Sequence, residues 1–101
     1  MTTALTAGLA PMHPGELLRE IVLPGTDLAN ADIARRLGIS RQHLHNIETE
    51  KKTVTPLLAC RLPRLFGNTP QLWLRMQEAY DLARVERECG EELERIEPIA
   101  A

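Results

Sequence analysis

The twenty residues from Asn30 to Thr49 constrain the fold more than any other stretch of the chain. Apolar residues recur at helical spacing on both sides of Gly38-Ile39-Ser40, and they form one stripe on each of two short helices. The stripes are Ile33, Ala34 and Leu37 on the first helix and Leu44 and Ile47 on the second. Glycine can end the first helix in a left-handed conformation, Ile39 is an apolar plug, and serine favours the N-cap of the second. This pattern predicts a helix-turn-helix.

The second helix carries polar side chains opposite its apolar stripe. At about 100° per residue, four residues share this exposed face, and Arg41 lies at its N-terminal edge. The four are Gln42, His45, Asn46 and Thr49. Such side chains supply the donors and acceptors that read base edges in the major groove of DNA. We therefore expect a recognition helix; the alternative is an ordinary solvated face.

Charge is distributed unevenly along the chain, although the net charge is only −2. Residues 31–64 contain seven basic and three acidic side chains, whereas residues 65–101 contain four basic and eight acidic ones. The basic segment surrounds the helix-turn-helix and suits a phosphate backbone. Lys51 and Lys52 directly follow the second helix, where they would lie beside that backbone. The acidic segment suits either solvent or a basic partner.

Length and composition exclude several classes of protein. A chain of 101 residues, 44% of them hydrophobic, suits one globular domain. No apolar run approaches the ~20 residues of a membrane span and no signal-peptide pattern begins the chain, so we expect a cytoplasmic protein without a membrane partner. We expect no metal or other cofactor and no enzyme activity. Cys60 and Cys89 lack metal-ligand spacing, and His43 and His45 point about 200° apart on one helix.

Proline and glycine mark the helix that precedes this motif. His13-Pro14-Gly15-Glu16 opens it and Pro24-Gly25 ends it. Its expected apolar stripe is Leu17, Leu18 and Ile21. The scaffold helix that follows lacks a capping side chain at Ala29, so we expect Thr26 or Asp27 to cap it instead.

Thr55-Pro56 opens a fourth helix with a cap and an N1 proline. Its stripe is Leu58, Leu62 and Leu65. Pro63 lies inside this helix and cannot donate to the carbonyl of Ala59, which costs roughly 3 kcal/mol in a regular helix. We therefore expect a kink or a break at residues 61–62.

Thr69-Pro70 repeats the same signal after Gly67-Asn68 and opens a longer helix that extends to about Glu88. Its stripe is Trp73, Met76, Gln77, Tyr80 and Arg84. Core packing explains part of this stripe. Because four preceding helices already enclose a small core, we also expect a two-fold dimer seam on this helix. The seam residues are Trp73, Met76, Gln77 and Tyr80.

Four segments carry a resemblance to a known family. They are MHPGELL at 12–18, IARRLGISRQHLHNI at 33–47, V-T-P at 54–56 and FGNTPQLWLRMQEAYDL at 66–82. In this order they resemble the HigA-type antitoxins, small Cro/repressor-like proteins of bacterial type II toxin–antitoxin operons. The helix-turn-helix alone is generic, whereas the combination of the first and last segments is specific to this family.

The resemblance implies a fold and a set of partners. The fold is all-α, a five-helix lambda-repressor-like helix-turn-helix domain with a C-terminal dimerisation helix. We place this domain at residues 12–88, between a disordered tail at 1–11 and an acidic tail at 89–101. The implied protein is a homodimer that binds palindromic operator DNA, represses its own operon and neutralises a HigB-type mRNA-cleaving ribonuclease toxin.

The resemblance also assigns residues. The positions that contact DNA in Cro/repressor-like domains are here Ser40, Arg41, Gln42 and Asn46. Asn30 occupies a position that usually holds a phosphate-binding Gln. This chain departs from the family at Thr49-Glu50, where Asn-Gly is usual, and at Pro63, where Ala is usual.

In a homodimer, the two recognition helices, related by a two-fold axis, would enter successive major grooves about 34 Å apart. Arg41 is then the candidate for guanine, and Gln42 or Asn46 the candidate for adenine. The alternative function is a stand-alone transcriptional repressor without a toxin partner. The helix-turn-helix is common to both functions and does not separate them.

Overall fold

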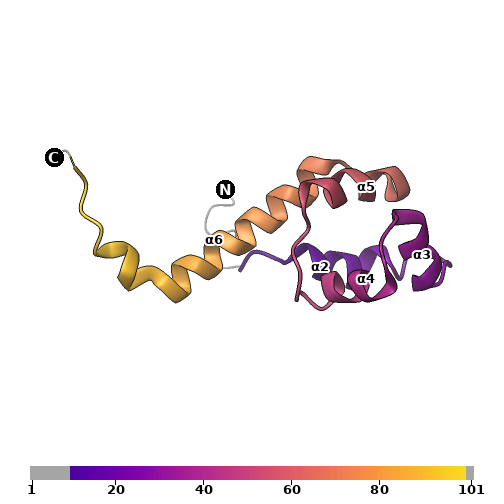
Figure 1. Cartoon of the computed structure of the whole chain (residues 1–101), viewed down its shortest axis with the longest axis horizontal. Helices are drawn as coiled ribbons and strands as arrows, with labels where there is room; N and C mark the ends of the chain where they lie inside the picture. The colour runs from indigo at the N-terminus through magenta and orange to yellow at the C-terminus, as the bar shows by residue number, and fades with distance from the viewer. Residues whose placement is uncertain (1–9, 100–101) are drawn as a thin grey trace, which may run out of the picture.

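A computed structural model describes residues 10–99, and within this range the chain is all-helical, as predicted (Figure 1). The elements are α2 (Pro14–Leu17), the π-helical turn η1 (Leu18–Val22), α3 (Asn30–Leu37), α4 (Arg41–Glu48), α5 (Pro56–Phe66) and α6 (Pro70–Glu94). The predicted N-terminal tail lies outside the described residues, except for its last two positions. No helix in the described range is long and apolar enough to cross a membrane.

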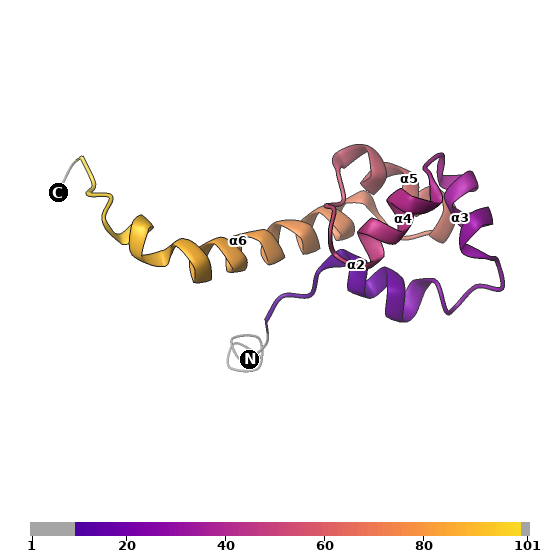
Figure 2. The same cartoon turned by 60° about the horizontal axis from the view of Figure 1, so that its bottom comes forward.

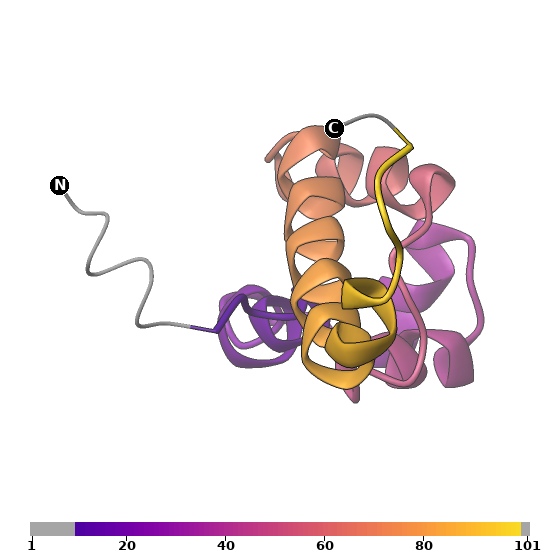
Figure 3. The ribbon, with the colours of Figure 1, turned by 90° about the vertical axis from the view of Figure 1, so that its left-hand side faces the viewer.

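Helices α2 to α5 form a compact body at one end of the molecule, and α6 leaves this body as a long projecting helix (Figures 1 and 2). The described chain is accordingly elongated, with principal extents of 55 × 31 × 20 Å. Viewed from the C-terminal side, α2 lies on one side of α6, and α3 and α4 lie on the other (Figure 3). Only the first half of α6 therefore packs against the body.

The core contains the predicted stripes of both helices of the helix-turn-helix. Its buried apolar residues are Leu18, Leu23, Ile33, Ala34, Leu37, Leu44, Ile47, Val54, Leu58, Ala59, Leu62 and Trp73. Trp73 is fully buried, and its indole Nε1 donates to Asn68 Oδ1 at 2.7 Å. Because this N–H is satisfied, α6 can seal the core with a large side chain at no polar cost.

The first helix departs from its predicted stripe. Leu18 is buried, but Ile21 is 61% exposed, so its assignment to the core is wrong. The cause is η1, in which the N–H of Leu23 bonds to the carbonyl of Leu18 five residues earlier. This wider turn changes the helical phase, so Val22 and Leu23 pack against the core in place of Ile21.

Two further local predictions are also wrong. Neither Thr26 nor Asp27 caps α3: its N-cap residue Ala29 makes no side-chain bond, and Thr26 Oγ1 accepts from the N–H of Leu28 instead. In addition, α5 runs unbroken through Pro63.

Packing explains why α5 survives its proline. Ala59 and Leu62 are both fully buried, which holds the backbone against the core on the N-terminal side of Pro63. On the other side, the N–H of Gly67 donates to the carbonyl of Pro63 at 2.8 Å and closes the last turn. The lost bond is therefore confined to one position.

The last helix begins as predicted and extends further than predicted. Thr69 caps α6 by accepting from the N–H of Leu72, and Pro70 occupies the first turn. The helix continues past Glu88 to Glu94, with a kink at Cys89, where φ is −121° and ψ is 16°.

Candidate nucleic-acid interface

The turn between α3 and α4 has the predicted geometry. Gly38 adopts a left-handed conformation with φ of 76°, which ends α3. Ser40 is the N-cap of α4, and its Oγ accepts from the N–H of His43 at 2.9 Å. Ile39 is half-buried against the core between them. The helix-turn-helix predicted from the sequence is therefore present.

The outward face of α4 carries the predicted polar groups. Arg41, Gln42 and His45 are exposed and line one shallow hollow, while Leu44 and Ile47 anchor the opposite face in the core. This arrangement leaves the long polar side chains free to reach a ligand while the helix backbone is fixed.

Two amides on this face are aligned with each other. Gln42 Nε2 donates to Asn46 Oδ1 at 3.0 Å, one helical turn away. The pair leaves Gln42 Oε1 as an acceptor and Asn46 Nδ2 as a donor. Adenine presents the complementary N6 donor and N7 acceptor in the major groove. The amide pair therefore presents an acceptor and a donor that complement those of adenine.

The end of α4 is built by a loop that folds back on the helix. The N–H of Glu50 bonds to the carbonyl of Ile47, and the N–H groups of Lys51 and Lys52 both bond to the carbonyl of Asn46. This pattern is a Schellman C-cap, in which the residue after the C-cap is left-handed. Glu50 holds that position with φ of 66°, so this chain places a glutamate where glycine is the usual residue.

The remaining candidates surround this end of the helix. Lys51 and Lys52 are exposed, whereas half-buried Thr49 donates from Oγ1 to the carbonyl of His45 at 2.9 Å. Asn30, at the start of α3, lies beside the same end and donates from Nδ2 to Glu48 Oε2 at 3.4 Å. The structure thus gathers the predicted DNA-contacting residues on α4, at its two ends and at the start of α3.

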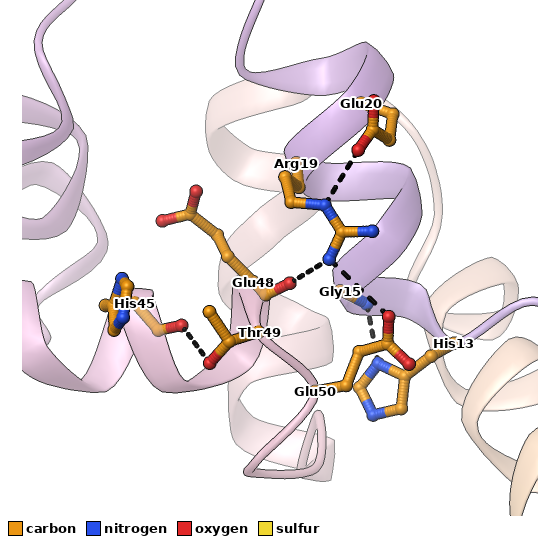
Figure 4. A network of polar contacts seen from close by, with 8 residues as sticks. All are labelled: His13, Gly15, Arg19, Glu20, His45, Glu48, Thr49 and Glu50. Carbon is orange, nitrogen blue, oxygen red and sulfur yellow. Dashed lines mark hydrogen bonds and ion pairs between the residues drawn. The ribbon is translucent and has the colours of Figure 1, made fainter.

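Two arginines near α4 contact the protein's own backbone. Arg61, counted above among the basic residues of this region, donates from Nη1 to the carbonyls of Leu37 and Gly38. Arg19, which the sequence analysis did not single out, donates from Nη1 to the carbonyl of Glu48 at 2.6 Å (Figure 4). The sequence offers no signal for this bond, because its partners are 29 positions apart.

His13 lies close to the same network (Figure 4). It is buried, its Nδ1 accepts from the N–H of Gly15 at 2.8 Å, and its ring meets Tyr80 edge-on with centroids 4.8 Å apart. Burial lowers the pKa of His13 below its ordinary value, although Glu50 and Asp81 partly oppose this shift. His13 is therefore a neutral N-cap that joins α2 to α6.

The four residues predicted to form a dimer seam divide into two pairs. Trp73 is fully buried and Gln77 is 6% exposed, so neither has surface to offer a partner. Gln77 instead satisfies the core, because its Oε1 accepts from the N–H of Val54 at 2.8 Å. Met76 and Tyr80 remain partly exposed. The helical stripe predicts which residues share a face of α6, but not how much of that face the protomer itself covers.

Met76 lies in an apolar groove of about 490 Å³ on the surface. Its other lining residues are Pro11, Met12, Thr69, Leu72, Arg75 and Ala79. Elsewhere in the part of the chain that the structure describes, no three His, Cys, Asp or Glu side chains come together as a metal site would require.

Fold and site together define a helix-turn-helix protein of the Cro/repressor-like class. Virulence-associated protein I of Dichelobacter nodosus is 40% identical over 77 residues, which are 76% of this chain and 71% of that protein. The solved structure of the antitoxin GraA matches with a TM-score of 0.84 at 34% identity, covering 91% of this chain and 100% of GraA. The Pseudomonas aeruginosa antitoxin HigA, solved with the higBA promoter, matches with a TM-score of 0.80 at 34% identity, covering 88% of this chain and 98% of the HigA chain.

No protein-family model matches the sequence. The likeness to these solved antitoxins nevertheless spans nearly their whole length at more than 30% identity. The chain belongs to the HigA-type antitoxin family.

Proposed function

We propose that this protein is an antitoxin that binds operator DNA as a homodimer through α4, represses its own operon and neutralises a HigB-type mRNA-cleaving ribonuclease toxin. The observation that carries the DNA-binding part is the exposed row of Arg41, Gln42 and His45 on a helix whose opposite face is locked in the core. The family relationship supports the toxin partner. The proposed role requires binding only, without a catalytic step.

The side chains of α4 and its flanking loop have separate roles in this proposal. Arg41 reads guanine through O6 and N7, and the aligned pair of Gln42 and Asn46 reads adenine. Lys51 and Lys52 contact phosphates, which adds affinity without sequence preference. Two copies related by a two-fold axis then read a palindrome whose half-sites are about 34 Å apart.

The dimer seam in this proposal is smaller than the sequence stripe. It contains Met76 and Tyr80 together with the neighbouring apolar groove, whose exposed members include Met12 and Leu72. Exposed apolar side chains gathered along one groove are typical of a surface that a partner covers.

A gel-shift panel tests the DNA-binding roles. The probes are a duplex from the region directly upstream of this gene and point variants of its protected site. We expect Arg41→Ala to lose discrimination at one base pair per half-site, by about 1–3 kcal/mol, and Lys51→Ala to weaken binding to every duplex alike. An identical, sequence-independent loss for both variants contradicts these roles.

A stand-alone repressor is the second candidate. YbaQ, an HTH-type transcriptional regulator of Escherichia coli, is 34% identical over 92 residues, which are 89% of this chain and 81% of that protein. Both candidates share the DNA-binding face, so co-purification with a toxin distinguishes them.

A further inference from the structure

Two arginines from outside the helix-turn-helix hold α4 at its two ends. At the C-terminal end, Arg19 of η1 donates to the carbonyl of Glu48. On its N-terminal side, Arg61 of α5 donates to the carbonyls of Leu37, the last residue of α3, and Gly38, which begins the turn into α4, at 3.2 and 3.1 Å. Carbonyls at helix ends lack intrahelical partners, so each guanidinium completes a bonding need of the motif itself.

Close packing reinforces the contact at the C-terminal end of α4. Gly15 lies one turn before Arg19 on the same helical segment. A Cβ atom at Gly15 would lie 1.9 Å from the carbonyl oxygen of Ile47, so only glycine permits this approach. The segment from Gly15 to Arg19 therefore meets the last turn of α4 both by close backbone contact and by a charged hydrogen bond.

The guanidinium of Arg19 is already committed to protein groups. Its Nε donates to Glu20 Oε2 at 2.8 Å, and its Nη1 also lies 3.5 Å from Glu50 Oε2 (Figure 4). Arg61 is half-buried over the turn. Protein groups thus engage Nε and Nη1 of Arg19 and Nη1 of Arg61, in contrast to Lys51 and Lys52, which are exposed.

We infer that Arg19 and Arg61 are positioning residues for DNA recognition, which fix both ends of α4 and thereby determine which base edges its side chains reach. This inference rests on the proposed DNA binding. Hydrogen bonds to base edges weaken steeply when distance or angle departs from the ideal. Attraction to phosphates tolerates such shifts, because it is electrostatic and independent of sequence. Loss of either arginine should therefore reduce specificity more than general affinity.

Fluorescence anisotropy with two duplexes tests this inference. One duplex carries the region directly upstream of this gene, and the other is a scrambled duplex of the same composition. We expect Arg19→Met and Arg61→Met to lose about tenfold in affinity for the upstream duplex, the discrimination that one well-placed base contact supplies. Affinity for the scrambled duplex should change by less than about twofold, and the salt dependence should stay the same.

Matched variants separate position from charge. Arg64 is an exposed arginine on the same helix as Arg61, so Arg64→Met removes the same charge without touching the turn. It should leave the ratio of the two affinities unchanged. Arg61→Lys should restore most of that ratio, because one ammonium group can donate to both carbonyls. Arg19→Lys should restore less, since a point charge cannot reproduce bonds from both Nε and Nη1.

Two results would overturn the inference. Equal losses on both duplexes, with a salt slope shallower by about one, identify a phosphate contact instead. An unchanged affinity ratio with lower stability identifies a merely structural arginine.

A measurement without DNA keeps this test separate from the proposed function. If the wild-type chain shows no preference for the upstream duplex, the proposed function fails, and amide hydrogen exchange then decides only whether Arg19 fixes the end of α4. In Arg19→Met, the amides of Thr49 and Glu50 at the end of α4 should exchange faster than in wild type, whereas Arg64→Met should leave them unchanged. The same exchange rate in all three proteins would show that Arg19 does not fix the end of α4.

Discussion

Gly15→Ala should destabilise the protein strongly, although it adds only one methyl group. The added Cβ would lie 1.9 Å from the carbonyl oxygen of Ile47, whereas ordinary contact begins at 3.4 Å. The two helices must therefore separate by about 1.5 Å, the difference between those distances. Such a shift strains packing around Ile47, which is fully buried, and breaks the 2.6 Å bond from Arg19 to Glu48.

The opposing contributions set the size of the effect. Overpacking of a close-packed core costs about 1–3 kcal/mol, and a lost hydrogen bond to a charged group about 1.5 kcal/mol where the group is partly exposed. The better helix propensity of alanine returns about 1 kcal/mol. We therefore expect the free energy of unfolding to fall by about 1.5–3.5 kcal/mol, a large share of the stability of a domain of this size.

The assay is urea unfolding at one fixed protein concentration, followed by the fluorescence of Trp73 and by circular dichroism. Gly90→Ala is the matched control, because Gly90 lies in α6 and nothing approaches its added Cβ within 4 Å. It should raise the free energy of unfolding by about 0.5–1 kcal/mol. If Gly15→Ala is as stable as the wild type or is stabilised like Gly90→Ala, the close approach of α2 to α4 is refuted.

Three further predictions concern particular residues. Pro63→Ala should raise the free energy of unfolding by about 1–2 kcal/mol, because it restores the backbone hydrogen bond to the carbonyl of Ala59 inside a continuous helix. An unchanged midpoint of urea unfolding would contradict this. Because its folded-state pKa is lowered, His13 contributes stability that is full above its unfolded pKa of 6.5 and is lost as pH falls below it. His13→Asn, which keeps an acceptor for the cap, should therefore flatten the loss of stability between about pH 7.5 and 5.5, and equal slopes would refute this. Met76→Glu should convert the dimer to a monomer, as measured by light scattering, whereas Leu57→Glu, at an exposed position on α5, should leave the dimer intact. If the Met76→Glu variant is still a dimer, Met76 is not part of the seam.

Local signals predicted much of this fold because they act within a few residues. The Ser40, Thr55 and Thr69 caps each require only one side-chain oxygen and an N–H three residues on. Gly38 ends its helix because glycine alone takes φ of 76° freely. The exposed face of α4 follows equally from helical periodicity.

Other features depend on contacts that periodicity does not record. Ile21 is exposed because a π-turn changes the phase of its helix, and Pro63 is accommodated because packing holds the backbone around it. Trp73 is fully covered by its own protomer, a fact that depends on where α6 crosses the core. The bond from Arg19 to Glu48 joins two elements that are distant in sequence. Each of these outcomes is decided by tertiary packing.

Antitoxin function is tested by co-expressing a tagged copy of this chain with the neighbouring open reading frame. The material that co-purifies is analysed by light scattering and then titrated with the upstream duplex. We expect a stable complex that contains two copies of this chain and a small basic partner, whose ribonuclease activity is blocked within the complex. A dimer that purifies without a partner, yet binds the duplex specifically, would contradict the antitoxin assignment and establish a stand-alone repressor.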